Sequence, residues 1–100
     1  MSEAVIIHLV VHGRVQGVGY RAFVDSEARV RNLQGWVRNC RDGTVEAVLA
    51  GDAALIEDMI AICKRGPFGA RVDAIHHSAG SASSLKERAP GQAFSVLPTI

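Results

Sequence analysis

The sequence predicts an α+β sandwich in which two helices pack on one face of an antiparallel sheet. Strand and helix patterns follow one another in the order β-α-β-β-α-β, with a further short strand at the end, and a hairpin signal falls between the two helices. That order and that hairpin are typical of this fold class. The 100 residues suffice for one hydrophobic core and are too few for two, so we expect a single domain over residues 1–100.

The first half of this order rests on a strand, a glycine-rich loop and a helix. Apolar side chains at alternate positions of residues 5–12 share one face, which predicts the first strand. Three glycines within residues 13–19 predict a loop. The first helix is expected from about Tyr20 to about Asn32, because asparagine tolerates the left-handed conformation that often ends a helix.

A hairpin and a second helix follow. Residues 35–41 and 44–50 are strand-like runs on either side of Asp42-Gly43, a dipeptide that predicts a two-residue type I′ turn. Gly51-Asp52 opens the second helix, and Gly66-Pro67 ends it. The helix carries a core stripe at helical spacing, formed by Ile56, Met59, Ile60 and Cys63.

The last third of the chain gives weaker signals. Residues 70–77 are expected to form a strand. Residues 78–92, rich in serine, alanine and glycine, are expected to form a polar connection with a helical turn near Leu85. A short last strand is expected at residues 93–97, where Pro98 stops it.

Composition and charge argue against several classes of function. Hydrophobic residues make up 48% and charged residues 21%, which is ordinary for a globular protein, and the formal net charge is +1. A charge that small selects for neither nucleic acid nor an anionic membrane, and no apolar run approaches the roughly 18 residues of a membrane span. The first residues lack the basic and apolar regions of a signal peptide, and Cys40 and Cys63 form no C-x-x-C pair. We therefore expect a cytoplasmic protein that binds no membrane.

Residues 13–19 and the helix start behind them predict an anion-binding site. Glycines at 13, 17 and 19 let backbone N–H groups converge without obstruction by Cβ atoms. The start of the helix adds unpaired N–H donors and a partial positive charge. A Walker A loop is excluded, because no Gly-Lys-Ser/Thr occurs. The Rossmann match Gly17-x-Gly19-x-x-Ala22 is followed by a hairpin, where that fold needs parallel crossovers.

Arg21 and Asn39 are the candidate side chains of this site. A cation in the first turn of a helix opposes the helix dipole, unless a bound phosphoryl group is shared between the cation and the amides. Arg21 is therefore either an anion ligand or a solvated arginine at an exposed helix end. Asn39 shares a strand face with Val37, near the same rim of the sheet as Arg21. Asn39 is either a site residue or a buried amide that ties down the hairpin.

Two motifs resemble those of a known family. Gly13-Arg14-Val15-Gln16-Gly17-Val18-Gly19-Tyr20-Arg21 resembles the phosphate loop of acylphosphatases, and Gly35-Trp36-Val37-Arg38-Asn39, with Gly43-Thr44-Val45 and Gly51, resembles the second signature of that family. The similarity covers nearly the whole chain. It implies a ferredoxin-like α/β sandwich and a hydrolase that cleaves the carboxyl–phosphate bond of acyl phosphates, releasing a carboxylate and inorganic phosphate.

The resemblance also implies the composition of the site. Arg21 and the loop backbone would hold the phosphoryl group, and Asn39 would position the water for in-line attack, so that Arg21 and Asn39 are the catalytic residues. The implied phosphate-binding residues are Val15, Gln16, Gly17, Val18, Gly19, Tyr20 and Arg21. No metal and no cofactor are expected. The expected partner is a small-molecule acyl phosphate, with no specific nucleic acid, and we expect a monomer.

Other residues that often carry chemistry fit other sites poorly. The four histidines, His8, His12, His76 and His77, lack the spacing of a zinc site and are expected at solvent-facing strand positions. A cysteine phosphatase requires Cys-x5-Arg, which neither cysteine satisfies. Trp36 is expected to pack against the fold rather than to stack on bases.

The main alternative function is a binding module. RNA-recognition domains share the β-α-β-β-α-β order, but they expose aromatic side chains on central strands, and residues 44–50 hold none. A regulatory or small-molecule-binding module of the ferredoxin-like kind is the second alternative, which phosphate binding without hydrolysis would favour.

Overall fold

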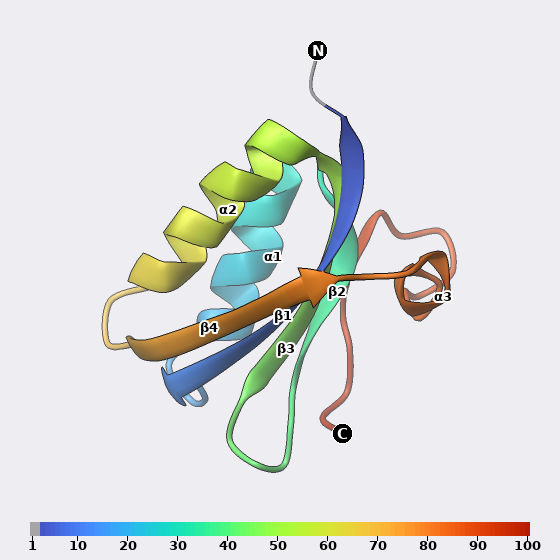
Figure 1. The fold of residues 1–100 in the computed structure, drawn as a ribbon. Coiled ribbons are helices and arrows are strands. Elements are labelled where there is room, and N and C mark those ends of the chain that lie inside the picture. The colour runs from blue at the N-terminus through green and yellow to red at the C-terminus, as the bar shows by residue number, and fades with distance from the viewer. Residues whose placement is uncertain (1–2) are drawn as a thin grey trace.

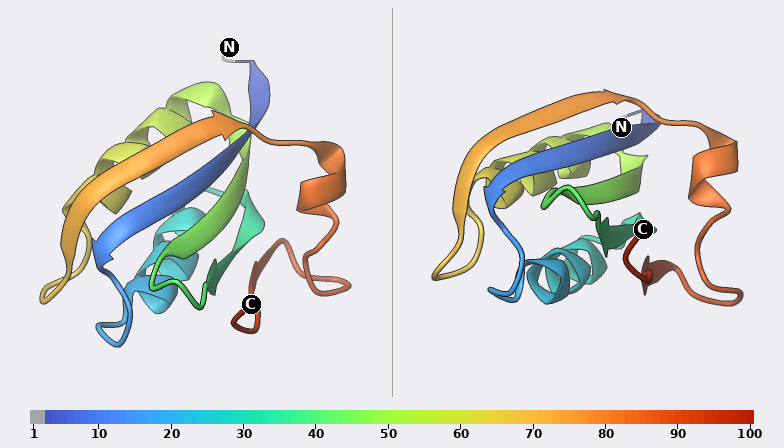
Figure 2. Two further views of the ribbon diagram at one scale, coloured as in Figure 1. Left: turned by 60° about the horizontal axis from the view of Figure 1, so that its bottom comes forward. Right: turned by 90° about the horizontal axis from the view of Figure 1, so that it is seen from below.

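A five-stranded sheet forms the centre of the protein. The computed structural model describes residues 3–100. Its elements are β1 (Ala4–Arg14), α1 (Tyr20–Val30), β2 (Gln34–Asn39), β3 (Val45–Asp52), α2 (Ala53–Arg65), β4 (Arg71–Ala79), α3 (Ala82–Leu85) and β5 (Phe94–Val96) (Figure 1). The strands lie side by side in the order β4-β1-β3-β2-β5. Helices α1 and α2 cover one face of the sheet, as Figure 2 shows, so the predicted sandwich is confirmed.

The sheet is mixed rather than purely antiparallel. β1 pairs antiparallel with β3 and β4, and β2 pairs antiparallel with β3. β5 instead runs parallel to β2, with Phe94 opposite Gly35. The prediction of an antiparallel sheet is therefore wrong at this edge. The connection after β4 crosses to the opposite edge of the sheet, and β5 begins at the same end of the strands at which β4 finishes. β5 therefore runs antiparallel to β4 and parallel to β2, and no hairpin signal in the sequence fixes that direction.

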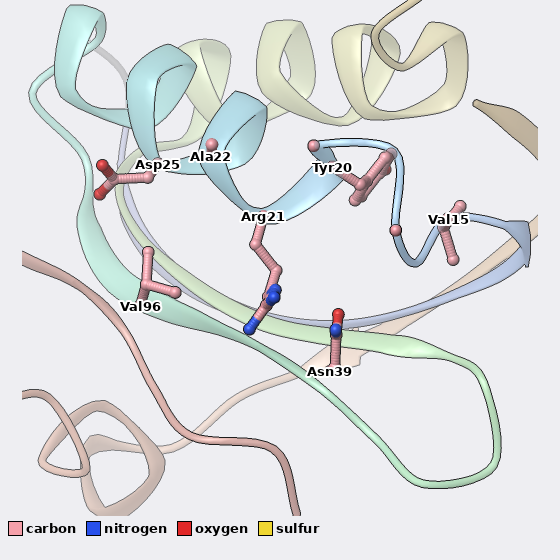
Figure 3. A pocket seen from close by; sticks show the side chains of 9 residues that line it. Val15, Tyr20, Arg21, Ala22, Asp25, Asn39 and Val96 are labelled. Carbon is pink, nitrogen blue, oxygen red and sulfur yellow. The ribbon is translucent and has the colours of Figure 1, made fainter. Parts of the chain in front are cut away.

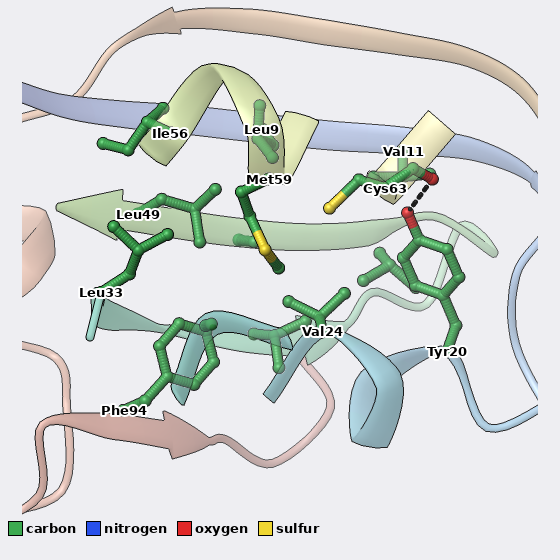
Figure 4. Close-up of a cluster of buried hydrophobic side chains, with 14 of the residues drawn as sticks. Leu9, Val11, Tyr20, Val24, Leu33, Leu49, Ile56, Met59, Cys63 and Phe94 are labelled. Atoms are coloured by element: carbon green, nitrogen blue, oxygen red, sulfur yellow. Dashed lines mark hydrogen bonds between the residues drawn. The ribbon is translucent and has the colours of Figure 1, made fainter. Parts of the chain in front are cut away.

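The core lies between the sheet and the two long helices (Figure 4). Its buried side chains come from α1, α2, every strand except β4, and the two segments that flank α1: Leu9, Val11, Val15, Tyr20, Val24, Ala28, Leu33, Val37, Val45, Ala47, Leu49, Ile56, Met59, Cys63 and Phe94. The predicted α2 stripe is confirmed, with Ile60 half-buried beside it. Burial raises the pKa of the Cys63 thiol to about 11, so this cysteine is a neutral packing residue.

The hairpin between β2 and β3 corrects the predicted turn type. Among residues 3–100, Asn32 is the one non-glycine residue with a positive φ, so Asp42 cannot occupy the first central position of a type I′ turn. The loop has three residues instead, with Gly43 at φ 93° and its N–H donated to the Cys40 carbonyl at 3.1 Å. The Asp42 carboxylate accepts from the Thr44 N–H and hydroxyl, and these hydrogen bonds favour the longer loop.

The helix ends match the sequence signals. Asn32 lies at φ 54° just after α1, and the Leu33 N–H donates to the Ala28 carbonyl at 2.9 Å, which closes a left-handed helix end. At the start of α2 the Asp52 carboxylate accepts from the N–H groups of Ala54 and Leu55. No helix among residues 3–100 is long and apolar enough to cross a membrane.

The face of the sheet opposite α1 and α2 carries a polar network around Trp36. The indole is buried, and its N–H donates to the Ser84 carbonyl in α3, which confirms Trp36 as a packing residue. The Arg38 guanidinium lies 4.5 Å from the indole centroid and pairs with Glu46 at 2.8 Å and with Glu87 at 3.3 Å. This network therefore fixes α3 against the sheet.

The four histidines are not all on that face. His8 contacts Glu46 there at 2.6 Å, and the rings of His12 and His76 are 5.0 Å apart. His77 pairs with Leu9 across the β1–β4 ladder and so lies on the helix-facing side, where it is exposed at the sheet edge. His12, His76 and His77 are all exposed, as predicted, whereas His8 is half-buried. Within residues 3–100 no three His, Cys, Asp or Glu side chains come together as a metal site.

Candidate active site

The glycine-rich segment turns the chain from the end of β1 into α1. The pairing with β4 changes register between His12 and Gly13 and continues with Gly13 opposite Val72 and Arg14 opposite Arg71. A Cβ on Gly13 would lie 2.1 Å from the Arg71 carbonyl oxygen, so only glycine permits this approach of β4. We call residues 15–19 the phosphate loop, after the acylphosphatase segment that they resemble. At Gly19, with φ 81°, an added Cβ would meet nothing within 4 Å, so the loop surface is open on that side.

The N-terminus of α1 lacks a side-chain cap. Its N-cap residue is Gly19, no side chain accepts from the first-turn N–H groups, and no acidic residue lies in the first turn. These N–H donors and the positive end of the helix dipole therefore face outward. Arg21, in the same turn, adds a full positive charge.

A hollow of about 350 Å³ lies where the phosphate loop, α1 and the end of β2 meet. Figure 3 shows the side chains of Arg21 and Asn39 pointing into this space from α1 and β2, toward one another. The residues that line it are Val15, Gly17, Gly19, Tyr20, Arg21, Ala22, Asp25, Asn39 and Val96. The two candidate side chains from separate sequence motifs thus share one cavity.

Asn39 is held by its backbone and carries an unpaired amide oxygen. β3 pairs with it on one side through Val45, and on the other side its carbonyl accepts from the Ile100 N–H at 3.1 Å. The residue is only 9% exposed, and its buried Oδ1 has no hydrogen-bond partner in the described chain. A buried acceptor without a partner is unusual, because the loss of its hydration is then not offset. The oxygen is therefore suited to a donor that comes from outside the protein.

The positive charge of Arg21 has no carboxylate partner within residues 3–100. The ion pairs there involve other residues, and Asp25, the one acidic residue that lines the hollow, is bound to Arg29 at 3.0 Å. Arg29 also donates to the Phe94 carbonyl at 2.7 Å, and this hydrogen bond holds the Asp25–Arg29 pair beside the hollow. An unneutralised guanidinium beside uncapped amides can bind an anion such as a phosphoryl group.

The structure brings together most, but not all, of the predicted phosphate-binding residues. Val15, Gly17, Gly19, Tyr20 and Arg21 line the hollow. The Tyr20 phenol does not point into the hollow, because it is buried and donates to the Cys63 carbonyl at 2.8 Å (Figure 4). Burial also raises the pKa of that phenol, so it stays neutral.

Gln16 and Val18 do not line the hollow. The Gln16 amide turns to the β2–β3 hairpin, where it donates to two carbonyls. Val18 is half-buried against the core. That their backbone N–H groups bind phosphate stays a prediction.

Sequence reasoning missed three lining residues: Ala22, Asp25 and Val96. Asp25 lies one helical turn after Arg21, and this i, i+4 spacing was a signal that could have found it. Val96 had no such signal, because only the parallel pairing of β5 with β2 places it at the site.

Comparisons with known proteins agree on one family. The family model for Acylphosphatase matches residues 7–89. A protein named acylphosphatase from Rhodopseudomonas palustris (strain BisB18) is 51% identical over 98 residues, which are 98% of this chain and 99% of that protein. One from Bradyrhizobium diazoefficiens is 49% identical over 100 residues, 100% of both proteins. The crystal structure of acylphosphatase from Bacillus subtilis matches with a TM-score of 0.81 and 32% identity, over 95% of this chain and 99% of that one.

Proposed function

The chain belongs to the acylphosphatase family and is an enzyme that hydrolyses acyl phosphates, and from this we propose how its residues perform the reaction. The phosphoryl group is held by Arg21 and by the backbone N–H groups of residues 15–21. Asn39 positions the attacking water. No metal and no cofactor take part.

The unpaired Oδ1 of Asn39 carries this proposal. Asn39 lines the same hollow as Arg21 and the uncapped start of α1, and its buried Oδ1 has no partner among residues 3–100. A water that donates to Oδ1 satisfies the acceptor and turns its own lone pair away from Asn39, toward the phosphoryl group. The arrangement thus separates the two tasks: α1 and the loop hold the anion, and β2 holds the nucleophile.

The reaction needs few groups because the leaving group is good. Water attacks phosphorus in line with the bond to the acyl oxygen, that bond breaks, and its electron pair leaves on the carboxylate, which requires no proton. Charge redistributed over the phosphoryl oxygens is stabilised by Arg21 and the fixed amides. The water's proton passes to an oxygen of the phosphoryl group itself. Asp25 is a poor candidate for the base, because its carboxylate is bound to Arg29.

The test is hydrolysis of benzoyl phosphate by purified protein in EDTA. We expect the wild type to be active, and Arg21→Ala and Asn39→Ala each to lower kcat by about 10²–10³-fold, as for the loss of one electrostatic or positioning group. Arg71→Ala is the matched control, since Arg71 is exposed and pairs only with Asp73 within the described residues. Circular dichroism checks that each variant is folded.

Two further outcomes decide between mechanisms. Asp25→Asn should keep most of the activity if the phosphoryl group takes the proton, and a loss as large as that of Asn39→Ala would make Asp25 the base. A wild type that binds inorganic phosphate but releases no product would contradict the proposal and favour a binding module.

A further inference from the structure

The side chain of Gln16 joins the phosphate loop to the hairpin that follows Asn39. Its Nε2 donates to the Cys40 carbonyl and to the Thr44 carbonyl, both at 2.8 Å. The Cys40 N–H also donates to the Thr44 carbonyl, at 2.9 Å. Because a side-chain amide nitrogen has two hydrogens, both are used and the orientation of the group is fixed.

These two hydrogen bonds bridge parts of the site that the fold otherwise supplies separately. Gln16 lies between loop residues that line the hollow, and Cys40 directly follows Asn39. Within residues 3–100, no other hydrogen bond links residues 15–19 to residues 40–44. Both segments lie at the same end of the sheet (Figure 2), and the amide is half-buried between them.

We propose that Gln16 is a positioning residue for hydrolysis, which holds the phosphoryl cradle at a fixed distance from the Asn39 amide. This inference rests on the proposed function. The groups that hold the anion lie on the loop and on α1, whereas the group that holds the water lies on β2. Gln16 therefore controls how the two are placed relative to one another, and a displacement of about 1 Å between nucleophile and substrate can lower a rate by 10²-fold.

This role differs in its consequences from a purely structural one. Phosphate binding depends on the loop and Arg21, all on one side of the bridge, and should survive the loss of Gln16. Placement of the water against the phosphoryl group depends on both the loop and β2, so it should be impaired when Gln16 is lost. A residue that only stabilises the fold would lower the unfolding temperature and leave the kcat of the folded enzyme unchanged.

The experiment is a double-mutant cycle on kcat for benzoyl phosphate, with wild type, Gln16→Leu, Asn39→Ala and the double variant. We expect Gln16→Leu to lower kcat by about 10-fold while the inhibition constant of inorganic phosphate changes by less than about two-fold. In the Asn39→Ala background the same substitution should change kcat by less than about two-fold, because the positioned group is already absent. Gln34→Leu is the matched control, because it removes an exposed amide at the start of β2 that makes no side-chain hydrogen bond within residues 3–100 and does not line the hollow.

The outcomes separate this inference from the proposed function. An unchanged kcat in Gln16→Leu, or an equal fold loss with and without Asn39, overturns the role of Gln16 alone. An Asn39→Ala variant with wild-type kcat overturns the proposed function, and this inference with it. If Gln16→Leu does not fold, Gln16→Met, which has the same chain length and no donor, replaces it in the cycle.

Discussion

The two long helices begin in opposite ways. At α2 the Asp52 carboxylate accepts from Ala54 N–H at 2.9 Å and from Leu55 N–H at 3.3 Å. At α1 the N-cap position is Gly19, no side chain accepts from the first turn, and Arg21 adds a cation to the positive end of the dipole. The first arrangement stabilises a helix from within, by about 1 kcal/mol. The second leaves donors and charge available to an anion from outside.

The uncapped helix is stabilised by its packing instead. Tyr20, Val24 and Ala28 are each no more than 1% exposed, and the Tyr20 hydroxyl donates to the Cys63 carbonyl of α2. Burial of large apolar side chains contributes about 1.5–3 kcal/mol each, which outweighs a missing cap. Local rules of helix design are therefore broken at α1, where the substrate binds in our proposal, and kept at α2, which contributes no residue to the lining of the hollow.

Adding a carboxylate at the start of α1 removes the difference between the two helix starts and should have the largest effect. Gly19→Asp places an anion among the first-turn amides, where it competes with the phosphoryl group, and we expect kcat/KM to fall by about 10³-fold. Gly19→Asn is the control, since both residues tolerate φ 81° and an added Cβ meets nothing within 4 Å. Steady-state hydrolysis of benzoyl phosphate measures both. Equal losses in the two variants would assign the effect to backbone strain and not to charge.

Arg21→Lys tests whether geometry matters as well as charge. A lysine keeps the cation but loses the planar, two-pronged donor, so we expect kcat/KM to fall by about 10²-fold with little change in the thermal unfolding temperature. Competition by inorganic phosphate should weaken in parallel. Wild-type kinetics in this variant would mean that Arg21 acts only as a diffuse positive charge.

A second contrast lies within β2, where the neighbours Arg38 and Asn39 point to opposite faces. Arg38 is paired with Glu46 and Glu87, whereas the Asn39 oxygen has no partner in the described residues. Glu46→Gln should leave kcat unchanged and lower the free energy of unfolding at pH 7 by about 2 kcal/mol, since Glu46 accepts charged hydrogen bonds. Urea titration measures the loss.

The effect of Glu46→Gln should also depend on pH. Burial raises the pKa of Glu46, but the hydrogen bonds from His8 and Arg38 outweigh it and hold the pKa below its usual value. A carboxyl whose pKa is lowered on folding contributes its stability above the unfolded value, about 4.3, and loses it as the pH falls through the folded value. The difference in free energy of unfolding between wild type and Glu46→Gln should therefore become smaller as the pH falls below about 4.3. A difference in free energy of unfolding that stays constant down to pH 3 would contradict the lowered pKa of Glu46.

Asp52→Ala should have the smallest effect. Removing the cap of α2 should lower the free energy of unfolding by about 1 kcal/mol and leave kcat and KM unchanged, because α2 has no part in the site. Chemical denaturation measures the loss of stability, and benzoyl phosphate kinetics check that kcat and KM are unchanged. Lost activity in a fully folded variant would link α2 to the reaction.

The local features of this chain were predictable from its sequence, because each depends on neighbouring residues. The glycine-rich loop, the helix end at Asn32, the Asp52 cap and the α2 stripe all follow from short-range patterns. The two motifs were also expected to meet, since β1 and β2 run toward the same end of the sheet.

What the sequence could not show depends on distant parts of the chain. The direction of β5 is set by the path of residues 80–93, and it alone places Val96 at the hollow. The turn of the hairpin depends on the Asp42–Thr44 hydrogen bonds, which compete with the type I′ preference of the dipeptide. The bridge from Gln16 to Cys40 and Thr44 spans more than 20 residues and leaves no periodic trace.

In the proposed mechanism the uncapped start of α1 and the phosphate loop hold the phosphoryl group. Titration of ¹⁵N-labelled protein with inorganic phosphate tests this directly by following backbone amide shifts. We expect saturable shifts at residues 15–21 and at the Asn39 side-chain amide, with the first-turn amides of α2 at residues 53–55 unmoved. Shifts of the same size at both helix starts, or none at residues 15–21, would contradict it.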